Sequence, residues 1–591
     1  MNYRDTRAGE LTREDAGRTV QLAGWAARIR DQGGVMFVDL REATGVVQVV
    51  IDPASHSQAE SLRREFCISV SGEVSLRPAG SENPDLPTGE VEVVVSELHI
   101  LSASQALPFQ LDERADVDEL VRLRYRYLDM RRSRVAANLR ARSVAVAAMR
   151  RVLTEAGFLD IETPTLIKST PEGARDVLVP SRLQLGDFYA LPQSPQLFKQ
   201  LLMVGGFERY FQIARCYRDE DFRSDRQLEF SQLDIEGSFW GRDDVLATIE
   251  AVMVAVARDV RGVELATPFP RLTYQEALDR YGTDKPDLRF AMEIADLSDH
   301  FAATEFNAFA SALESGGVIR GLNVGAAGLS RSGLDALVDD AKQAGAAGLV
   351  WMVVEDDGSL RSPVAKFLSA DEQAALMEAL AGTPGDHLLI VADRARIAAE
   401  VLGRFRTRFG SPEGHDELNF LWVVDFPVFE ETPGGELVAA HHPFSAPVDV
   451  EDMATSPATA IAQAYDLVLN GSELGSGSVR IHDPDVQQKV FEILGISPDE
   501  AERRFGWFVE ALRYGTPPHA GFAVGIARLV SILQGEPNIR EVIAFPKTQT
   551  GVDPLTGSPS PVDDHQLAEL GIALRPEVQA ARDEAAGSGA D

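Results

Sequence analysis

The sequence predicts an α+β protein of several domains: an N-terminal β-barrel, a large core of strands and helices, and an α/β region inserted into that core. A chain of 591 residues is too long for a single hydrophobic core. Residues 18–104 have the pattern of five short strands separated by turns. Residues 285–415 alternate helices with strands, whereas the segments on either side are richer in strands.

The five N-terminal strands predict a barrel of the OB type, with a helical piece (SQAESLRREF) between the third and fourth strands. Trp25, Arg28 and Phe37 lie on its first strands. Such barrels use aromatic and arginine side chains there to hold single-stranded bases. The two aromatic rings could equally belong to the hydrophobic core, and the sequence leaves both possibilities open.

Two segments outside the strands have unusual composition. The arginines of residues 119–134, ELVRLRYRYLDMRRSR, fit either a solvated helix face or a surface that lines a polyanion between two domains. Residues 135–160 and 241–262 have helical patterns. The tail beyond Arg575 is small and polar, and we predict that it is disordered.

The overall composition excludes several classes of protein. A net charge of −34 argues against nonspecific coating of nucleic acid, although local arginine clusters can still bind it. The same charge could serve solubility, or suit a cell with high internal salt. Cys67 and Cys216 supply neither a disulfide framework nor a CxxC metal site. Because no apolar segment suits a signal peptide or a membrane span, we expect a cytoplasmic protein without a membrane partner.

One highly charged run lies between two apolar strands. Cys216–Glu236 contains three arginines and seven carboxylates. The sequence has no GxxxxGK[ST] phosphate loop, so a nucleotide would need another device, such as arginines that bind phosphate and carboxylates that hold Mg²⁺. We expect Arg218 and Glu220 on one face of a strand, because side chains two residues apart point the same way. Further candidates follow in later segments: Asp466, Glu473, Arg480 and Arg528.

Three motifs in order resemble those of the class II aminoacyl-tRNA synthetases: GFLDIETP with Pro164, CYRDEDFRSDRQLEFSQLD, and GIAR. The finer pattern is similar to the bacterial aspartyl-tRNA synthetases in STPEGARD, QSPQLFKQ, HHPF, GSELGSGSVRIH and NIREVIAFPKT. This resemblance extends to about residue 565. It implies activation of L-aspartate with ATP to aspartyl-adenylate, followed by transfer to the 3′ end of tRNA(Asp).

The resemblance also implies a domain plan. Its parts are an OB-fold anticodon-binding domain (1–108), a hinge (109–134), the first half of an antiparallel-sheet catalytic domain (135–284), an inserted domain shared with an amidotransferase subunit (285–415), the second half of the catalytic domain (416–550) and a C-terminal extension (551–591). A homodimer with an interface around Pro164 is implied as well.

The roles of individual residues follow from their matching positions. The resemblance assigns catalysis to Arg218, Glu220 and Arg528, and Mg²⁺ binding to Asp466 and Glu473. The implied ATP contacts are Arg218, Asp219, Glu220, Gln227, Phe230, Glu473, Gly525, Ile526, Ala527 and Arg528. The implied aspartate contacts are Glu172, Gln196, Lys199, Arg218, Asp234, His441 and Arg480. Arg28, Phe37 and Gln48 match positions that hold the anticodon.

The resemblance leaves two questions open, and they concern Ala527 and Gln32. The third motif usually carries an aspartate where this chain has Ala527, and we expect activity to survive. Gln32 lies in a loop whose residues affect whether tRNA(Asn) is also charged. The alternatives are therefore a relaxed enzyme that charges both tRNAs, an asparaginyl- or lysyl-tRNA synthetase, and an inactive RNA-binding paralogue. The insertion and the pair Lys199 and Arg480 favour aspartate over asparagine and lysine as the amino acid substrate.

Overall fold

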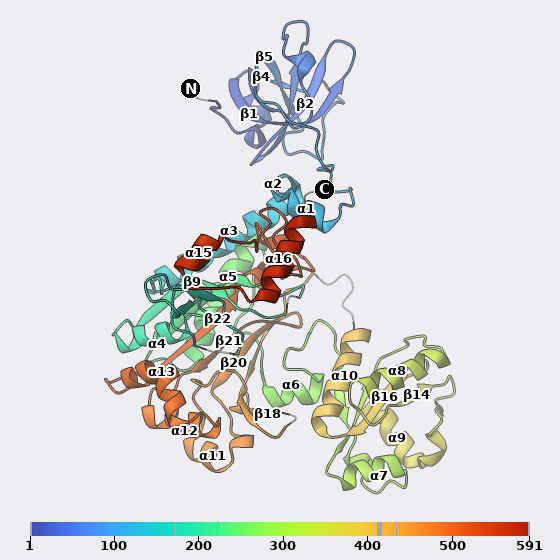
Figure 1. Ribbon diagram of the computed structural model, residues 1–591. Coiled ribbons are helices and arrows are strands. Elements are labelled where there is room, and N and C mark those ends of the chain that lie inside the picture. Colours follow the sequence, from blue (N-terminus) through green and yellow to red (C-terminus); the bar gives the residue numbers. More distant parts are fainter. Residues whose placement is uncertain (1–2, 171–172, 222, 411–415, 433, 589–591) are drawn as a thin grey trace. The chain divides into compact units, whose positions relative to one another are not determined.

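The computed structural model describes residues 3–170, 173–221, 223–410, 416–432 and 434–588, and it divides into two compact units, Met1–Val117 and Asp118–Asp591. Figure 1 shows the first unit in blue, with the second unit following along the chain. None of the helices in the described residues is long and apolar enough to cross a membrane.

The first unit is a closed five-stranded barrel with the strand order β1-β2-β3-β5-β4, which confirms the predicted OB-type fold. Its strands are β1 (Thr19–Asp31), β2 (Met36–Glu42), β3 (Gly45–Ile51), β4 (Cys67–Leu76) and β5 (Val91–Ser102). Alternate apolar residues point inward, as Val38 and Leu40 do on β2. The predicted helical piece between β3 and β4 is only a short 3₁₀ turn, Ala59–Ser61.

The second unit is built around an eight-stranded sheet with the order β11-β17-β20-β21-β22-β10-β9-β6. The strands are β6 (Leu159–Asp160), β9 (Arg209–Tyr217), β10 (Glu229–Ser238), β11 (Arg271–Thr273), β17 (Phe420–Val424), β20 (Ala464–Leu469), β21 (Ser472–Val479) and β22 (His519–Gly525). The outermost pairs are parallel and the inner pairs antiparallel. Strands from both sides of the insertion therefore form one sheet.

Helices cover one face of this sheet and leave part of the other open. The helices α3 (Ser133–Glu155), α5 (Arg242–Arg261) and α14 (Ile526–Leu533) pack in one core with the inward residues of the strands, such as Leu233 and Ile235. Because side chains alternate along a strand, Asp234 and Glu236 point to the opposite face. Further elements are α4 (Gln196–Val204), α6 (Tyr274–Tyr281), α11 (Val450–Thr455), α12 (Pro484–Ile493), α13 (Pro498–Leu512) and the hairpins β7 (Leu178–Pro180)/β8 (Phe188–Ala190) and β18 (Phe429–Glu431)/β19 (Leu437–Ala439).

The inserted region has its own five-stranded sheet, with the order β12-β13-β16-β14-β15. Its elements are β12 (Ile294–Asp296), α7 (Asn307–Glu314), β13 (Val318–Asn323), α8 (Arg331–Gln343), β14 (Val350–Val354), β15 (Leu360–Arg361), α9 (Ala370–Ala379), β16 (His387–Asp393) and α10 (Ala395–Phe409). Helices and strands alternate as predicted, but all four strand pairs are antiparallel. Two hydrophobic clusters, one on each face of this sheet, form its core.

The arginine-rich segment forms two short helices, α1 (Glu119–Arg124) and α2 (Arg126–Asp129), at the start of the second unit. Arg126 is 1% exposed, and it donates hydrogen bonds to Asp129 and to the carbonyl oxygens of Arg540, Ile543 and Ala544. Buried arginines need such partners. At least this arginine is therefore part of the protein interior and not of a solvated face.

The predicted disorder of the tail is wrong for most of its length. The tail forms the helix α16 (Pro576–Ser588), which follows α15 (Asp564–Glu569). The segment PEVQAARDEAAGS starts with a proline at the first helical position and is rich in alanine, glutamate and glutamine, which favour helix. Arg582 also ties it down through hydrogen bonds to Asp564 and to the Val562 carbonyl.

Candidate active site

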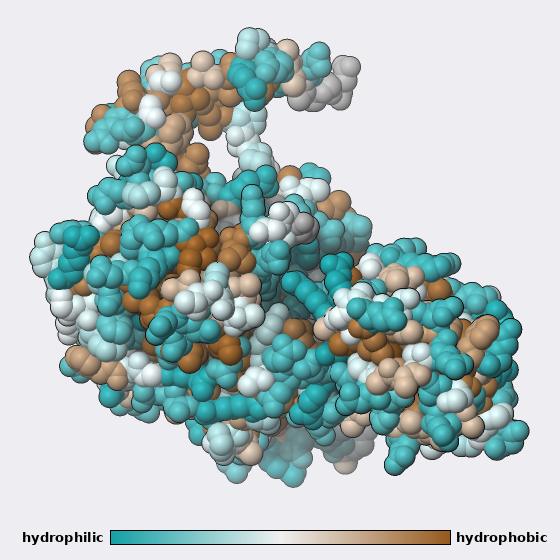
Figure 2. Space-filling model, turned by 90° about the horizontal axis from the view of Figure 1, so that it is seen from below, coloured by the Kyte–Doolittle hydropathy of each residue, from teal (hydrophilic) through white to brown (hydrophobic). Residues whose placement is uncertain are grey.

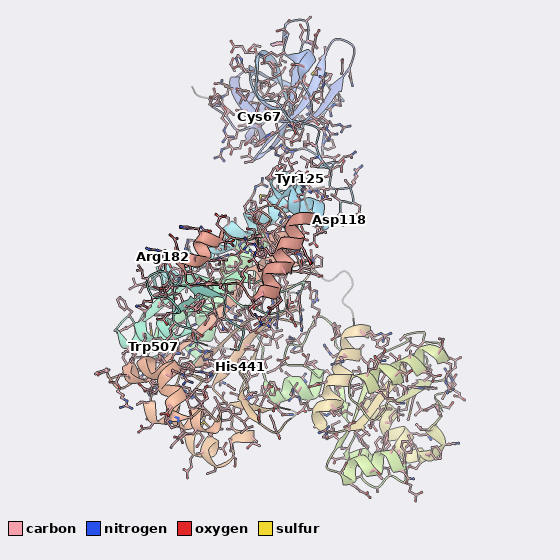
Figure 3. All side chains as sticks on the ribbon, in the orientation of Figure 1. Cys67, Asp118, Tyr125, Arg182, His441 and Trp507 are labelled. Atoms are coloured by element: carbon pink, nitrogen blue, oxygen red, sulfur yellow. The ribbon has the colours of Figure 1, made fainter. Side chains whose placement is uncertain are left out.

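A polar cavity of about 500 Å³ lies on the open face of the eight-stranded sheet. It collects most of the predicted site residues: Gln196, Lys199, Arg218, Glu220, Gln227, Phe230, Asp234, His441, Asp466, Glu473, Arg480, Gly525, Ala527 and Arg528. Figure 3 labels His441, which lies in the second unit. Strands β9, β10, β21 and β22 are neighbours in the sheet, which brings together residues that are far apart in the sequence.

Among the described residues predicted for catalysis, ATP or aspartate, Asp219 and Ile526 do not line this cavity. Glu172 lies outside the described residues. Asp219 faces Arg175, whose Nε lies 3.5 Å from its carboxylate, and the backbones of the two residues form a β-bridge. The side chain of Ile526 is buried in the core between the sheet and the helices, because α14 turns its apolar face inward. Ile526 can therefore meet a ligand only through its backbone.

Two buried cations lie at one end of the cavity. Lys199, on α4, is 1% exposed, and its Nζ donates a hydrogen bond of 3.0 Å to Asp234. Arg480 follows β21 and donates from Nε to Glu236 at 3.0 Å and from Nη1 to Ser478 at 2.9 Å. Buried charges are stable only when they are paired. Each cation at this end of the cavity is therefore held in place by a buried carboxylate.

Glu236 is a residue that our sequence interpretation missed. Its carboxylate lies between the two cations, 3.0 Å from Arg480 Nε and 3.5 Å from Lys199 Nζ. Burial opposes its ionisation, but Arg480 and Lys199 outweigh burial and hold the pKa of the Glu236 carboxyl below its usual value. The signal was present in LDIEG, since Glu236 follows Asp234 by two residues and shares its strand face.

Several buried polar atoms at this end have no hydrogen-bond partner among the described residues. They are Asp234 Oδ2, Gln196 Nε2 and His441 Nδ1. Burial raises the pKa of the Asp234 carboxyl, while Lys199 opposes that rise. Leaving such groups unsatisfied is costly, so their presence in a cavity indicates a polar ligand.

His442 is a second missed residue of the cavity wall. Burial, and after it the positive charges of Arg480 and Lys199, lowers the pKa of His442 to about 3. The imidazole is therefore neutral near pH 7 and adds no positive charge beside the two cations. The sequence motif HHPF contained the residue, but only His441 was singled out.

The other end of the cavity is formed by the connection between β9 and β10. The prediction that Arg218 and Glu220 lie on the first strand is wrong, because β9 ends at Tyr217. The many charges of this run favour a longer, solvated connection. Phe230 and Asp234 do lie on β10, as expected. Glu220 accepts a hydrogen bond of 2.5 Å from Arg226, so the connection is braced by its own charges.

One arginine at this end, Arg218, lies beside the aromatic ring predicted to stack adenine. The Arg218 guanidinium carbon lies 5.3 Å from the centroid of the Phe230 ring, a cation–π contact. Arg528, in the first turn of α14, donates from Nη1 to the Glu473 carbonyl oxygen at 2.6 Å. Gln227 forms two hydrogen bonds with the backbone of Lys547, at 2.9 and 3.1 Å, which leave one N–H and one oxygen lone pair of its amide for a ligand.

The two carboxylates predicted to bind Mg²⁺ lie close to one another. Burial and then Asp466 raise the pKa of Glu473. Asp466 accepts a hydrogen bond of 2.9 Å from His441 Nε2, and burial opposes but does not prevent a rise in the pKa of that histidine. The described residues hold no group of three or more side chains that could bind a metal by itself. The pair fits Mg²⁺ that completes its shell with phosphate and water oxygens.

The barrel has a separate candidate surface on the outside of β1, β2 and β3. Trp25 and Phe37 are absent from the barrel core and only partly buried, so both rings lie on the outer face. Arg28 is exposed. Gln48 is buried at the same surface, where its amide accepts from Arg30 at 2.9 Å and donates to Glu92 at 2.7 Å. The two aromatic rings therefore do not belong to the hydrophobic core of the barrel.

Family models match both units of the chain. A model described as "tRNA synthetases class II (D, K and N)" matches residues 118–549. A model described as "OB-fold nucleic acid binding domain" matches residues 20–101. The chain belongs to the class II tRNA synthetases, as its three motifs indicated.

Proteins of high sequence identity indicate which class II synthetases this chain is most like. The aspartate–tRNA(Asp/Asn) ligase of Rubrobacter xylanophilus is 53% identical over 583 residues, which cover 97% of each chain. The protein of the same name from Thermobifida fusca is 50% identical and covers 97% of this chain and 99% of its own.

Solved structures share the fold at low identity. An asparaginyl-tRNA synthetase from Pyrococcus horikoshii has a TM-score of 0.56 at 20% identity, covering 92% of this chain and 98% of its own. An aspartyl tRNA synthetase from Entamoeba histolytica also has a TM-score of 0.56 at 20% identity, covering 93% of this chain and 92% of its own.

Proposed function

We propose that this chain is an aspartate–tRNA ligase that activates L-aspartate with ATP and transfers it to tRNA. The observation that carries the proposal is the buried pair of cations, Lys199 and Arg480, held by Glu236 at one end of the cavity. A side-chain carboxylate completes this arrangement, and the unpaired oxygen of Asp234 can accept a hydrogen bond from the substrate ammonium. The names of the similar ligases support the same amino acid.

The first half-reaction requires mainly positioning. The α-carboxylate of aspartate attacks the α-phosphorus of ATP, the bond to the β-phosphate oxygen breaks, and pyrophosphate leaves. The nucleophile is already ionised, so orientation and charge neutralisation supply most of the catalysis. Arg218 is the residue suited to bridge the substrate carboxylate and the α-phosphate, because it lines the cavity and its guanidinium can donate in two directions.

We expect the same cations to reject asparagine. Asparagine is nearly the same size as aspartate but brings a neutral amide to Lys199 and Arg480. The buried cations would then lack the substrate charge for which they are arranged, which is the kind of mismatch that gives large discrimination. Neutral His442 leaves this charge balance unchanged.

Mg²⁺ would be held by Asp466 and Glu473, where it would neutralise phosphate charge on ATP. His441 would orient Asp466 through its hydrogen bond of 2.9 Å. The raised pKa of Glu473 reflects two carboxylates kept together, an arrangement that a cation would stabilise.

The similar ligases favour the relaxed alternative over an enzyme that charges tRNA(Asp) alone. The proteins from Rubrobacter xylanophilus and Thermobifida fusca are both named for tRNA(Asp/Asn). We therefore include tRNA(Asn) as a partner. The outer barrel face with Arg28, Phe37 and Gln48 is the proposed anticodon contact, and the cytoplasm is the compartment that we expect for this reaction.

A homodimer is the proposed assembly. Leu159 on the edge strand β6 is 51% exposed, and Leu166, just beyond Pro164, is 52% exposed. Exposed apolar side chains beside an unpaired strand edge favour association. Light scattering of the purified chain tests this, and a mass of one chain at micromolar concentration would contradict it.

Arg218→Ala tests the catalytic assignment. We expect aspartate-dependent ATP–pyrophosphate exchange to fall at least about 100-fold, because one transition-state donor is worth that much. Arg396→Ala, which removes an exposed arginine in the insertion, is the matched control and should leave exchange unchanged. Exchange near the wild-type rate in Arg218→Ala would show that Arg218 is not catalytic, and exchange with asparagine would contradict the proposed substrate.

Phe37→Ala tests the role of the barrel in tRNA binding separately from the role of the catalytic unit in adenylate formation. Loss of one base–aromatic stack costs about 1–3 kcal/mol, so we expect weaker tRNA charging with unchanged adenylate formation. An equal loss in both assays would contradict an anticodon role for this face.

A further inference from the structure

Arg528 is held by two groups of the protein. Its Nη1 donates to the Glu473 carbonyl oxygen at 2.6 Å, and its Nη2 lies 3.2 Å from Asp225 Oδ2. The neighbouring position, Ala527, offers no carboxylate. Asp225 comes from the connection between β9 and β10, more than 300 positions earlier in the chain.

The connection that carries Asp225 is fixed on both sides of it. Ser224 accepts a backbone hydrogen bond of 3.0 Å from Ile539. Gln227 binds the backbone of Lys547 through both ends of its amide. Asp225 is therefore presented to Arg528 by a segment that is tied to the chain beyond α14, and its contact does not depend on the ion pair alone.

We propose that Asp225 is a positioning residue, which acts through Arg528 to keep the guanidinium at the ATP end of the cavity before ATP binds. A free arginine side chain loses about 2 kcal/mol of rotamer entropy when it is fixed. Holding Arg528 in advance reduces the part of that cost that falls on ATP binding. Two of the guanidinium N–H groups are occupied by Asp225 and Glu473, so three N–H groups and the planar face stay available to a nucleotide.

This role differs from a contribution to folding stability. The side chains of Asp225 and Arg528 are 50% and 29% exposed, and exposed ion pairs contribute little to stability. Removing the Asp225 charge should therefore change ATP affinity and leave the melting temperature almost unchanged. The inference rests on the proposed function only in taking ATP as the ligand of this end of the cavity.

Asp225→Asn is the variant that tests the proposal, measured by calorimetric ATP binding and by ATP–pyrophosphate exchange. We expect the Kd and KM for ATP to rise roughly 3- to 10-fold, with kcat and the KM for aspartate unchanged. Asp225→Glu keeps the carboxylate and should recover most of the affinity. Asp340→Asn breaks a similarly exposed pair with Arg408 in the insertion and should have no effect.

A double-mutant cycle shows whether Asp225 acts through Arg528. In an Arg528→Met background, which has no cation for Asp225 to hold, Asp225→Asn should add no further rise in the KM or Kd for ATP. A full rise in that background, or ATP binding by Asp225→Asn equal to that of Asp340→Asn, would overturn the proposal. If the wild type binds ATP and Asp225→Asn weakens it, yet aspartate gives no exchange, the positioning role stands and the proposed function falls. A wild type that binds no ATP would overturn both.

Discussion

The two ends of the cavity are built in different ways. At the end proposed to bind aspartate, Lys199, Asp234, Glu236 and Arg480 are all buried and paired with one another. At the end proposed to bind ATP, pairs such as Glu220–Arg226 are partly exposed and lie in the connection between two strands. A buried network fixes a small site that must distinguish two nearly identical side chains, whereas exposed pairs can rearrange around a larger substrate with strong charges of its own.

Glu236→Gln should have the largest effect on stability and activity. The substitution keeps the shape of the side chain but leaves two buried cations with one carboxylate fewer. We expect the free energy of unfolding to fall by about 3–5 kcal/mol and aspartate-dependent exchange to be lost. Chemical denaturation and the exchange assay measure the two effects.

Glu229→Gln is the matched control for this change, since it removes a carboxylate from the same strand at a partly exposed position. It should cost about 1 kcal/mol or less. Equal costs for the two variants would contradict the view that burial distinguishes the ends of the cavity.

The pH dependence of stability tests the burial of a further residue of the cavity wall, His442. The pKa of His442 is about 3 in the folded chain and 6.5 for an unperturbed histidine. Between these values the unfolded chain binds more protons at this position, so stability falls as the pH falls from 6.5 toward 3. His442→Gln should make that decline shallower in denaturation curves, and His565→Gln, at an exposed position, should not. Identical slopes for wild type and His442→Gln would contradict the burial of a neutral imidazole.

Glu220→Gln should have the smallest effect on stability. Its partner Arg226 is 47% exposed on the side chain, so we expect the free energy of unfolding to change by less than about 1 kcal/mol. Thermal melting checks this value. A loss as large as that of Glu236→Gln would mean that both ends of the cavity depend equally on their ion pairs.

Features that depend on residues near one another in the sequence were predicted well, and features that depend on distant residues were not. The barrel strands and the elements of the insertion follow from their hydrophobic patterns, because turns and periodicity are local properties. The antiparallel pairing in the insertion does not, since alternation of helices and strands leaves strand direction undetermined. The helix α16 was missed because small polar residues suit both a disordered tail and a helix.

The site depended on longer-range relations. Arg480 was a candidate from its own segment, and Lys199 and Asp234 were found through the family resemblance. Glu236 is a partner of the cations and touches them only in the folded sheet. Likewise, Arg126 looked like one charge in a basic run, and its burial depends on carbonyl groups more than 400 positions away. Figure 2 shows hydrophilic residues interspersed with hydrophobic ones on the face in view.

Charging of purified tRNA(Asp) and tRNA(Asn) in parallel, with aspartate or asparagine as the amino acid, tests the central claim most directly. We predict aspartyl product on both tRNAs and no product from asparagine. Aspartyl product on tRNA(Asp) alone would contradict the relaxed choice of tRNA. Product from asparagine, or no product on either tRNA, would contradict the assignment of the buried cation pair to aspartate.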